Sequence, residues 1–190
     1  MIEEDPIKVL IKIAKILDEL KIDYYVTGGF AVSVWGKPRF TADIDLVIKL
    51  SHQKNTLSHK IQALFPTGYI DKNQIEAALL SLGQFNFIEP GSGLKIDFYI
   101  AKQDEFDQEC FRNSRPEDLG YKIKMISPEN LILSKLIWYK EAGSDRHLED
   151  IASVLDVSKN INRKYLTSWA RKLGLGDEWK KIAQGKKRHH

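Results

Sequence analysis

The stretch from Tyr25 to Ile48 most constrains the fold, because it sets two carboxylates into an otherwise apolar strand. Residues two apart in a strand point to the same face, so Asp43 and Asp45 project together, opposite Ile44, Leu46 and Ile48. Like charges side by side repel unless something positive lies between them. Hard Mg²⁺ prefers carboxylate oxygens, so the sequence predicts a Mg²⁺ site on this strand.

The pair Gly28-Gly29 stands between a short apolar strand and a short helix. A turn without Cβ atoms lets backbone N–H groups approach a phosphate, although a glycine pair alone is equally typical of a tight turn. Asp97 lies on the polar face of a later strand, where a single acid is usually a surface residue. Together the three features favour a phosphate cradle beside metal-binding carboxylates.

The order of elements predicts an α/β (α+β) fold with a mixed sheet flanked by helices and a C-terminal helical region. We expect strands near residues 24–27, 43–48, 84–88, 94–100 and 121–126, and helices near 6–20, 28–36, 51–65, 74–82 and 105–112. Further helices are expected after Ser127. The predicted domains are a core over 1–126, a helical region packed on it over 127–185, and a basic tail over 186–190.

The composition of the chain limits its binding partners and its cellular location. The net charge is +3, and five positive charges fall between Lys180 and Arg188, so the remainder sums to −2 and indicates no extended nucleic-acid surface. Cys110 is the only cysteine, which excludes an internal disulfide and favours a cytoplasmic location. No apolar run has membrane-spanning length. His189-His190 is typical of the start of a purification tag and is left out of the argument.

Gly28-Gly29, then Asp43-Ile44-Asp45, then Asp97 between Ile96 and Phe98 resemble the signature of the DNA polymerase β-like nucleotidyltransferases. The segment Arg39-Phe40-Thr41-Ala42-Asp43-Ile44-Asp45 is similar to one in small bacterial members, including the abortive-infection and type IV toxin–antitoxin nucleotidyltransferases. The resemblance covers about residues 24–100, and more loosely 129–150.

The resemblance implies an NTP substrate and two Mg²⁺ ions, or Mn²⁺ in their place. Asp43, Asp45 and Asp97 would be the metal ligands and catalytic residues, with Asp97 also activating an acceptor hydroxyl. Gly28 and Gly29 would hold the β- and γ-phosphates. An NMP would pass to the acceptor and pyrophosphate would leave.

Three further residues are predicted to belong to the nucleotide site, and each of them has an alternative role. Arg39 either reaches the triphosphate or pairs with an acid. Thr41 either caps the turn or orients Asp43. Lys135, in an apolar helix, either extends to solvent or is directed at the triphosphate or at Asp150. Asp150 itself is expected on an exposed helix face.

The leading hypothesis is therefore a metal-dependent, ATP- or other NTP-using nucleotidyltransferase whose acceptor is a small molecule, an RNA 3′ end or a protein hydroxyl. The alternative is a toxin–antitoxin component that binds a cognate toxin or antitoxin and has a secondary or silent enzyme site.

Overall fold

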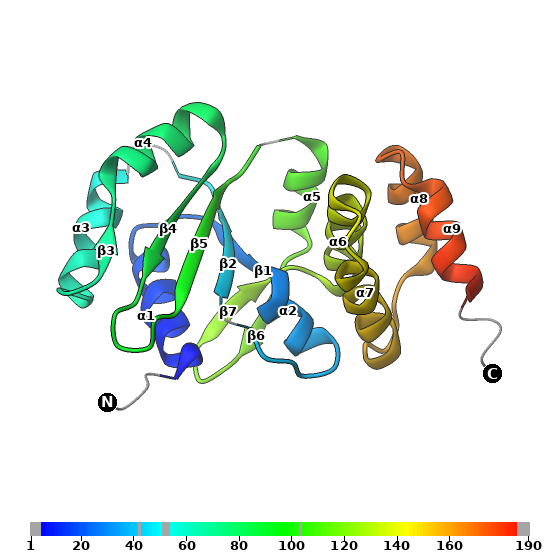
Figure 1. The fold of residues 1–190 in the computed structure, drawn as a ribbon, viewed down its shortest axis with the longest axis horizontal. Helices are drawn as coiled ribbons and strands as arrows, with labels where there is room; N and C mark the ends of the chain where they lie inside the picture. The colour runs from blue at the N-terminus through cyan, green and yellow to red at the C-terminus, as the bar shows by residue number, and fades with distance from the viewer. Residues whose placement is uncertain (1–4, 42, 51–53, 103, 186–190) are drawn as a thin grey trace. The chain divides into compact units, whose positions relative to one another are not determined.

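The computed structural model describes residues 5–41, 43–50, 54–102 and 104–185. Within these ranges the helices are α1 (Pro6–Glu19), α2 (Gly28–Trp35), α3 (Lys54–Leu64), α4 (Lys72–Ser81), α5 (Glu105–Arg112), α6 (Pro128–Ala142), α7 (Asp145–Val157), α8 (Arg163–Lys172) and α9 (Gly176–Gly185). The strands are β1 (Tyr24–Thr27), β2 (Asp43–Ile48), β3 (Tyr69–Ile70), β4 (Gln84–Ile88), β5 (Lys95–Ile100), β6 (Arg115–Asp118) and β7 (Lys122–Met125). Figure 1 shows this order along the chain.

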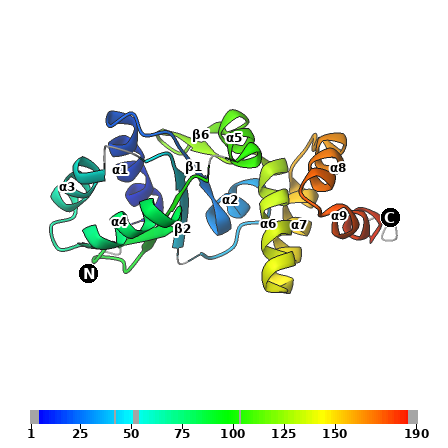
Figure 2. The ribbon, with the colours of Figure 1, turned by 90° about the horizontal axis from the view of Figure 1, so that it is seen from above.

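The described strands form one mixed sheet in the order β3-β4-β5-β2-β1-β7-β6. The centre of the sheet consists of β5, β2 and β1: β2 runs parallel to β5 and antiparallel to β1. Figures 1 and 2 show α1 running alongside the sheet. This architecture confirms the predicted α+β class with a mixed sheet.

Local sequence signals explain the ends of several helices. At α1, the Asp5 carboxylate accepts a hydrogen bond from the Ile7 N–H, and Pro6 occupies the first turn, where its missing donor costs nothing. Ser127 caps α6 by accepting from the Asn130 N–H at 3.2 Å. Gly143 ends α6 in the left-handed region that glycine adopts without strain.

Two strands were missing from the sequence prediction, and both lie at the edges of the sheet. β3 has only two residues, and β6 carries no apolar alternation. β6 also contains Pro116, which an edge strand tolerates because one side of its backbone needs no partner strand. Short edge strands of this kind form because they pair with a neighbouring strand, and their own residues show no alternation of apolar and polar side chains that would predict a strand. The predicted start of a helix at residues 51–53 lies outside the described residues.

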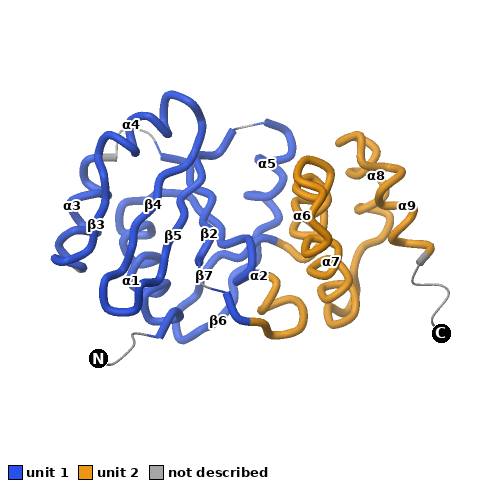
Figure 3. Tube along the Cα trace, viewed as in Figure 1, with its two compact units in different colours: residues 1–31, 40–126 blue, residues 32–39, 127–190 orange. Residues whose placement is uncertain are grey.

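The chain divides into two compact units, coloured separately in Figure 3. Unit 1 contains residues 1–31 and 40–126, and unit 2 contains residues 32–39 and 127–190. The expected boundary after residue 126 coincides with one of these divisions, but residues 32–39 group with the C-terminal helices. Packing of the helical region on the core remains a prediction, and the expected tail over 186–190 falls outside the described residues.

Within unit 2, α6 packs against α7 and α8, and α8 against α9. In unit 1, α1 packs against α3, and Val9, Ile13 and Leu17 on the apolar stripe of α1 are fully buried. None of the helices in the described parts of the chain is both long and apolar enough to span a bilayer.

Candidate active site

The predicted acidic strand is β2, and its burial alternates as the sequence pattern requires. Ile44, Leu46 and Ile48 are fully buried on one face, while Asp43 and Asp45 are half-buried on the other. The apolar face anchors the strand in the core, so the carboxylates are held at a fixed place on the sheet.

The parallel neighbour β5 brings the third acid to the same face. Asp45 is the register partner of Asp97, and Asp43 is the register partner of Lys95. Neighbouring strands lie about 4.8 Å apart, so side chains of register partners stand next to each other. Asp97 is only 4% exposed. The sheet thus gathers all three predicted carboxylates in unit 1.

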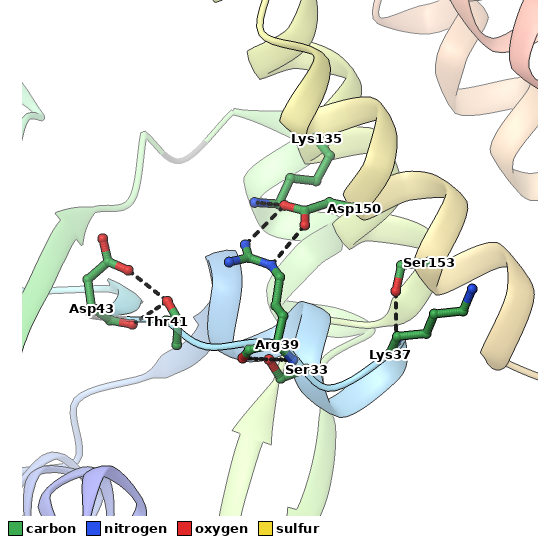
Figure 4. A network of polar contacts seen from close by, with 8 residues as sticks. All are labelled: Ser33, Lys37, Arg39, Thr41, Asp43, Lys135, Asp150 and Ser153. Carbon is green, nitrogen blue, oxygen red and sulfur yellow. Dashed lines mark hydrogen bonds and ion pairs between the residues drawn. The ribbon is translucent and has the colours of Figure 1, made fainter.

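Each of these acids has a partner within unit 1. The Lys95 Nζ lies 2.8 Å from Asp97 Oδ1 and 2.9 Å from Oδ2. The Tyr99 hydroxyl donates to Asp45 Oδ1 at 3.3 Å, and burial together with the Asp45 charge raises the pKa of that hydroxyl. The Thr41 hydroxyl donates to Asp43 Oδ1 at 2.8 Å (Figure 4).

The Thr41 contact matches the alternative in which this residue orients Asp43. Lys95 and Tyr99 were not predicted as site residues. Their signal was present in the sequence, because they stand two residues before and after Asp97 on the polar face of the same strand.

The glycine turn lies directly against the acidic strand. Thr27, the last residue of β1, is the register partner of Asp45, and Gly28 follows at φ +65°. A Cβ at Gly28 would overlap Asp45 Oδ2 and lie 2.5 Å from Asp45 Cγ. Only glycine fits, because both the backbone conformation and the space exclude a side chain. Gly29 lies in the first turn of α2, where backbone N–H groups point out of the end of the helix.

The three carboxylates of unit 1 are the candidate donors for a divalent cation. The described residues contain no group of three His, Cys, Asp or Glu side chains already arranged to hold a metal ion. The chemistry nevertheless fits a hard cation, because three carboxylates share one face of the sheet. Asp97 Oδ1 is buried, and it receives no geometrically suitable hydrogen bond within the described residues despite its closeness to Lys95. A cation would satisfy that oxygen.

A second charged cluster lies in unit 2 (Figure 4). Asp150 accepts hydrogen bonds from Arg39 Nε at 3.0 Å and from Arg39 Nη2 at 3.2 Å. The Lys135 Nζ lies 2.9 Å from Asp150 Oδ2. Arg39 therefore pairs with an acid, and Lys135 is directed at Asp150, as one of its alternatives stated. Two cationic side chains thus share the Asp150 carboxylate.

One expectation about this cluster was wrong: Asp150 was expected on an exposed face but is 3% exposed. Lys135 is 8% exposed, which rules out the alternative in which it extends to solvent. Asp150 lies on the same buried helix face as Val154, four residues later, and next to Ile151. That spacing was visible in the sequence, but a carboxylate on a buried face requires a cationic partner that only the folded chain supplies.

Searches with the sequence matched no protein-family model and no curated protein. Solved structures do match. The antibiotic-resistance factor ANT(2″)-Ia is 17% identical over 100% of this chain and 98% of its own, with a TM-score of 0.59. A nucleotidyltransferase-like antigenic protein from Paracoccidioides brasiliensis is 20% identical over 96% and 94%, with a TM-score of 0.54. The lincosamide antibiotic adenylyltransferase LnuA is 15% identical over 80% and 97%, with a TM-score of 0.53.

These matches show the fold: the chain has the DNA polymerase β-like nucleotidyltransferase fold. At sequence identities of 15–20%, structural similarity shows a shared fold and no more than that. The resemblance to toxin–antitoxin members stays a prediction, as do the roles of the individual site residues.

Proposed function

We propose that this protein is a metal-dependent nucleotidyltransferase that moves an NMP from an NTP to an acceptor hydroxyl and releases pyrophosphate. One observation carries the proposal: the register of β2 and β5 sets Asp45 beside Asp97 on the face that also bears Asp43, next to a turn that only glycine fits. A structural sheet has no use for three neighbouring carboxylates, because their repulsion opposes folding.

Asp43, Asp45 and Asp97 are proposed to hold up to two Mg²⁺ or Mn²⁺ ions. When bound, these ions would offset the charge of the phosphates at the reacting phosphorus. Thr41 keeps the Asp43 carboxylate oriented through its 2.8 Å hydrogen bond. Asp97, which is nearly buried, is proposed to accept the proton of the acceptor hydroxyl.

The backbone of Gly28 and Gly29 is proposed to bind the β- and γ-phosphates. The start of α2 supports this, since its N–H groups and helix dipole favour an anion. Arg39 and Lys135 are proposed to bind the triphosphate as well. Both are cationic side chains that share the carboxylate of Asp150, and cationic side chains of this kind bind phosphate oxygens.

The structural neighbours suggest which acceptor to test first. ANT(2″)-Ia has been solved with adenylyl-2″-tobramycin, and LnuA is a lincomycin-bound adenylyltransferase. We therefore propose adenylyl transfer from ATP to the hydroxyl of a small polar molecule, with an RNA 3′ end or a protein hydroxyl as the other acceptors to be compared.

The proposal is tested with Asp45→Asn, which removes the charge and keeps the shape. We expect wild-type protein to bind Mg²⁺-ATP by isothermal titration calorimetry and to transfer label from [α-³²P]ATP to an acceptor in a cell extract. Asp45→Asn should lose at least about 100-fold in transfer while its circular dichroism spectrum is unchanged.

Asp23→Asn is the matched control, because Asp23 lies before β1 at the other end of the sheet and pairs with Lys124 at 2.7 Å. It should keep full transfer. Folded wild-type protein that binds none of the four NTPs, or an Asp45→Asn variant with normal transfer, would refute the proposal.

A further inference from the structure

Lys95 brings a positive charge against one of the candidate metal ligands, Asp97. It precedes Asp97 by two residues on the same face of β5, and it is the register partner of Asp43 on β2. Its Nζ lies within 2.9 Å of both carboxylate oxygens of Asp97. The ammonium group therefore occupies the position from which a cation would neutralise Asp97.

The two members of the Lys95–Asp97 ion pair differ in their exposure to solvent. The Asp97 side chain is 5% exposed, whereas that of Lys95 is 41% exposed. Asp97 is held by its buried strand, but Lys95 has a long flexible chain that reaches solvent. If a second cation bound Asp97, the lysine could leave without breaking any part of the fold.

The ammonium group also lowers the repulsion on this face. Without it, Asp45 and Asp97 would stand as like charges directly opposite each other on neighbouring strands, which destabilises a sheet. A divalent ion gives the same neutralisation with a larger charge. An ammonium ion and a divalent ion within about 3 Å of one carboxylate repel each other strongly, so the two compete.

We propose that Lys95 is a positioning residue that neutralises Asp97 while no divalent ion is bound and is displaced from it by that ion. This inference rests on the proposed function, since it presumes a metal site at the three aspartates. Lys95 thereby stabilises the sheet of the metal-free protein and weakens its binding of metal ions.

The test is direct Mn²⁺ binding to nucleotide-free protein, followed by the loss of the free-Mn²⁺ signal in electron paramagnetic resonance. Lys95→Met keeps the aliphatic chain and removes the charge. We expect it to bind Mn²⁺ about fivefold more tightly than wild type, which corresponds to about 1 kcal/mol. Lys95→Arg keeps the charge and should bind Mn²⁺ like wild type.

Lys124→Met is the matched control. Lys124 also lies on a strand and pairs with an aspartate, Asp23, at 2.7 Å, and its side chain is 44% exposed, close to the value for Lys95. This variant loses the same charge from the same unit, so it should leave Mn²⁺ affinity within about twofold of wild type.

Thermal unfolding provides a readout that does not depend on activity. Lys95→Met should melt below wild type in a chelator, and saturating Mn²⁺ should raise its Tm by more than it raises that of wild type. If the variant is too unstable for titration, Lys95→Gln with the same two measurements replaces it.

These measurements distinguish failure of the proposed role of Lys95 from failure of the proposed function. Tight Mn²⁺ binding by wild type, with the same or weaker binding by Lys95→Met, would overturn the role of Lys95 and leave the proposed function standing. Absence of Mn²⁺ binding in every variant, with Asp97→Asn indistinguishable from wild type, would overturn both.

Discussion

Replacement of Gly28 by alanine probes the contact between the glycine turn and the acidic strand. Gly28 has φ +65°, and a Cβ there would overlap Asp45 Oδ2 and lie 2.9 Å from Asp45 Cβ. Alanine in the left-handed region costs about 1–2 kcal/mol. Rotation of Asp45 away from the new methyl adds about 1 kcal/mol for the off-rotamer side chain and about 1 kcal/mol for the lost hydrogen bond to Tyr99.

The expected destabilisation of Gly28→Ala is therefore about 3–4 kcal/mol. Gly93→Ala is the matched control, because Gly93 lies in the same unit at φ +69° and a Cβ added there would meet no atom within 4 Å, so the variant carries the backbone cost alone. Urea unfolding followed by far-ultraviolet circular dichroism should place the two variants about 2 kcal/mol apart in free energy of unfolding.

The same substitution separates stability from function. Under conditions where both variants are folded, Gly28→Ala should lose Mg²⁺-ATP binding, because the Asp45 carboxylate is displaced, whereas Gly93→Ala should bind like wild type. Equal destabilisation of the two variants, together with unchanged nucleotide binding by Gly28→Ala, would refute the close approach of the turn to Asp45.

Two further predictions concern unit 2, which contains all four tryptophans of the chain and can be followed by their fluorescence. Asp150→Ala should cost about 3–5 kcal/mol in urea unfolding, because it removes the carboxylate that the buried Lys135 ammonium group contacts at 2.9 Å and that Arg39 also contacts; a loss below about 1 kcal/mol would contradict the buried cluster. Burial and the nearby Lys135 charge lower the pKa of His147 below its usual 6.5. The unfolded chain therefore takes up this proton first as pH falls through 6.5, so stability decreases with acidification, and His147→Gln should flatten that part of the stability–pH curve. A curve unchanged by this substitution would show that His147 is not the group responsible.

The acidic strand illustrates what the sequence alone determined. The alternation of Ile44, Leu46 and Ile48 with Asp43 and Asp45 sets which side chains share a face, because the side-chain period of a strand is two residues whatever the strand pairs with. Helix ends were equally predictable where a capping residue acts within its own turn, as Ser127 does at α6. Such features depend on neighbours a few residues away.

Tertiary structure decided which distant residues meet. The register that sets Asp45 beside Asp97 joins strands separated along the chain by α3, β3, α4 and β4, and no local pattern specifies it. Lys95 was visible on the polar face, but only the folded chain shows that its ammonium group contacts Asp97. The burial of Asp150 was mispredicted for the same reason: the cost of burying a carboxylate is offset by Arg39, more than a hundred residues earlier in the chain. The sequence thus determined the chemistry that each element can offer, whereas long-range pairing of charges and strands determined which of those groups act together.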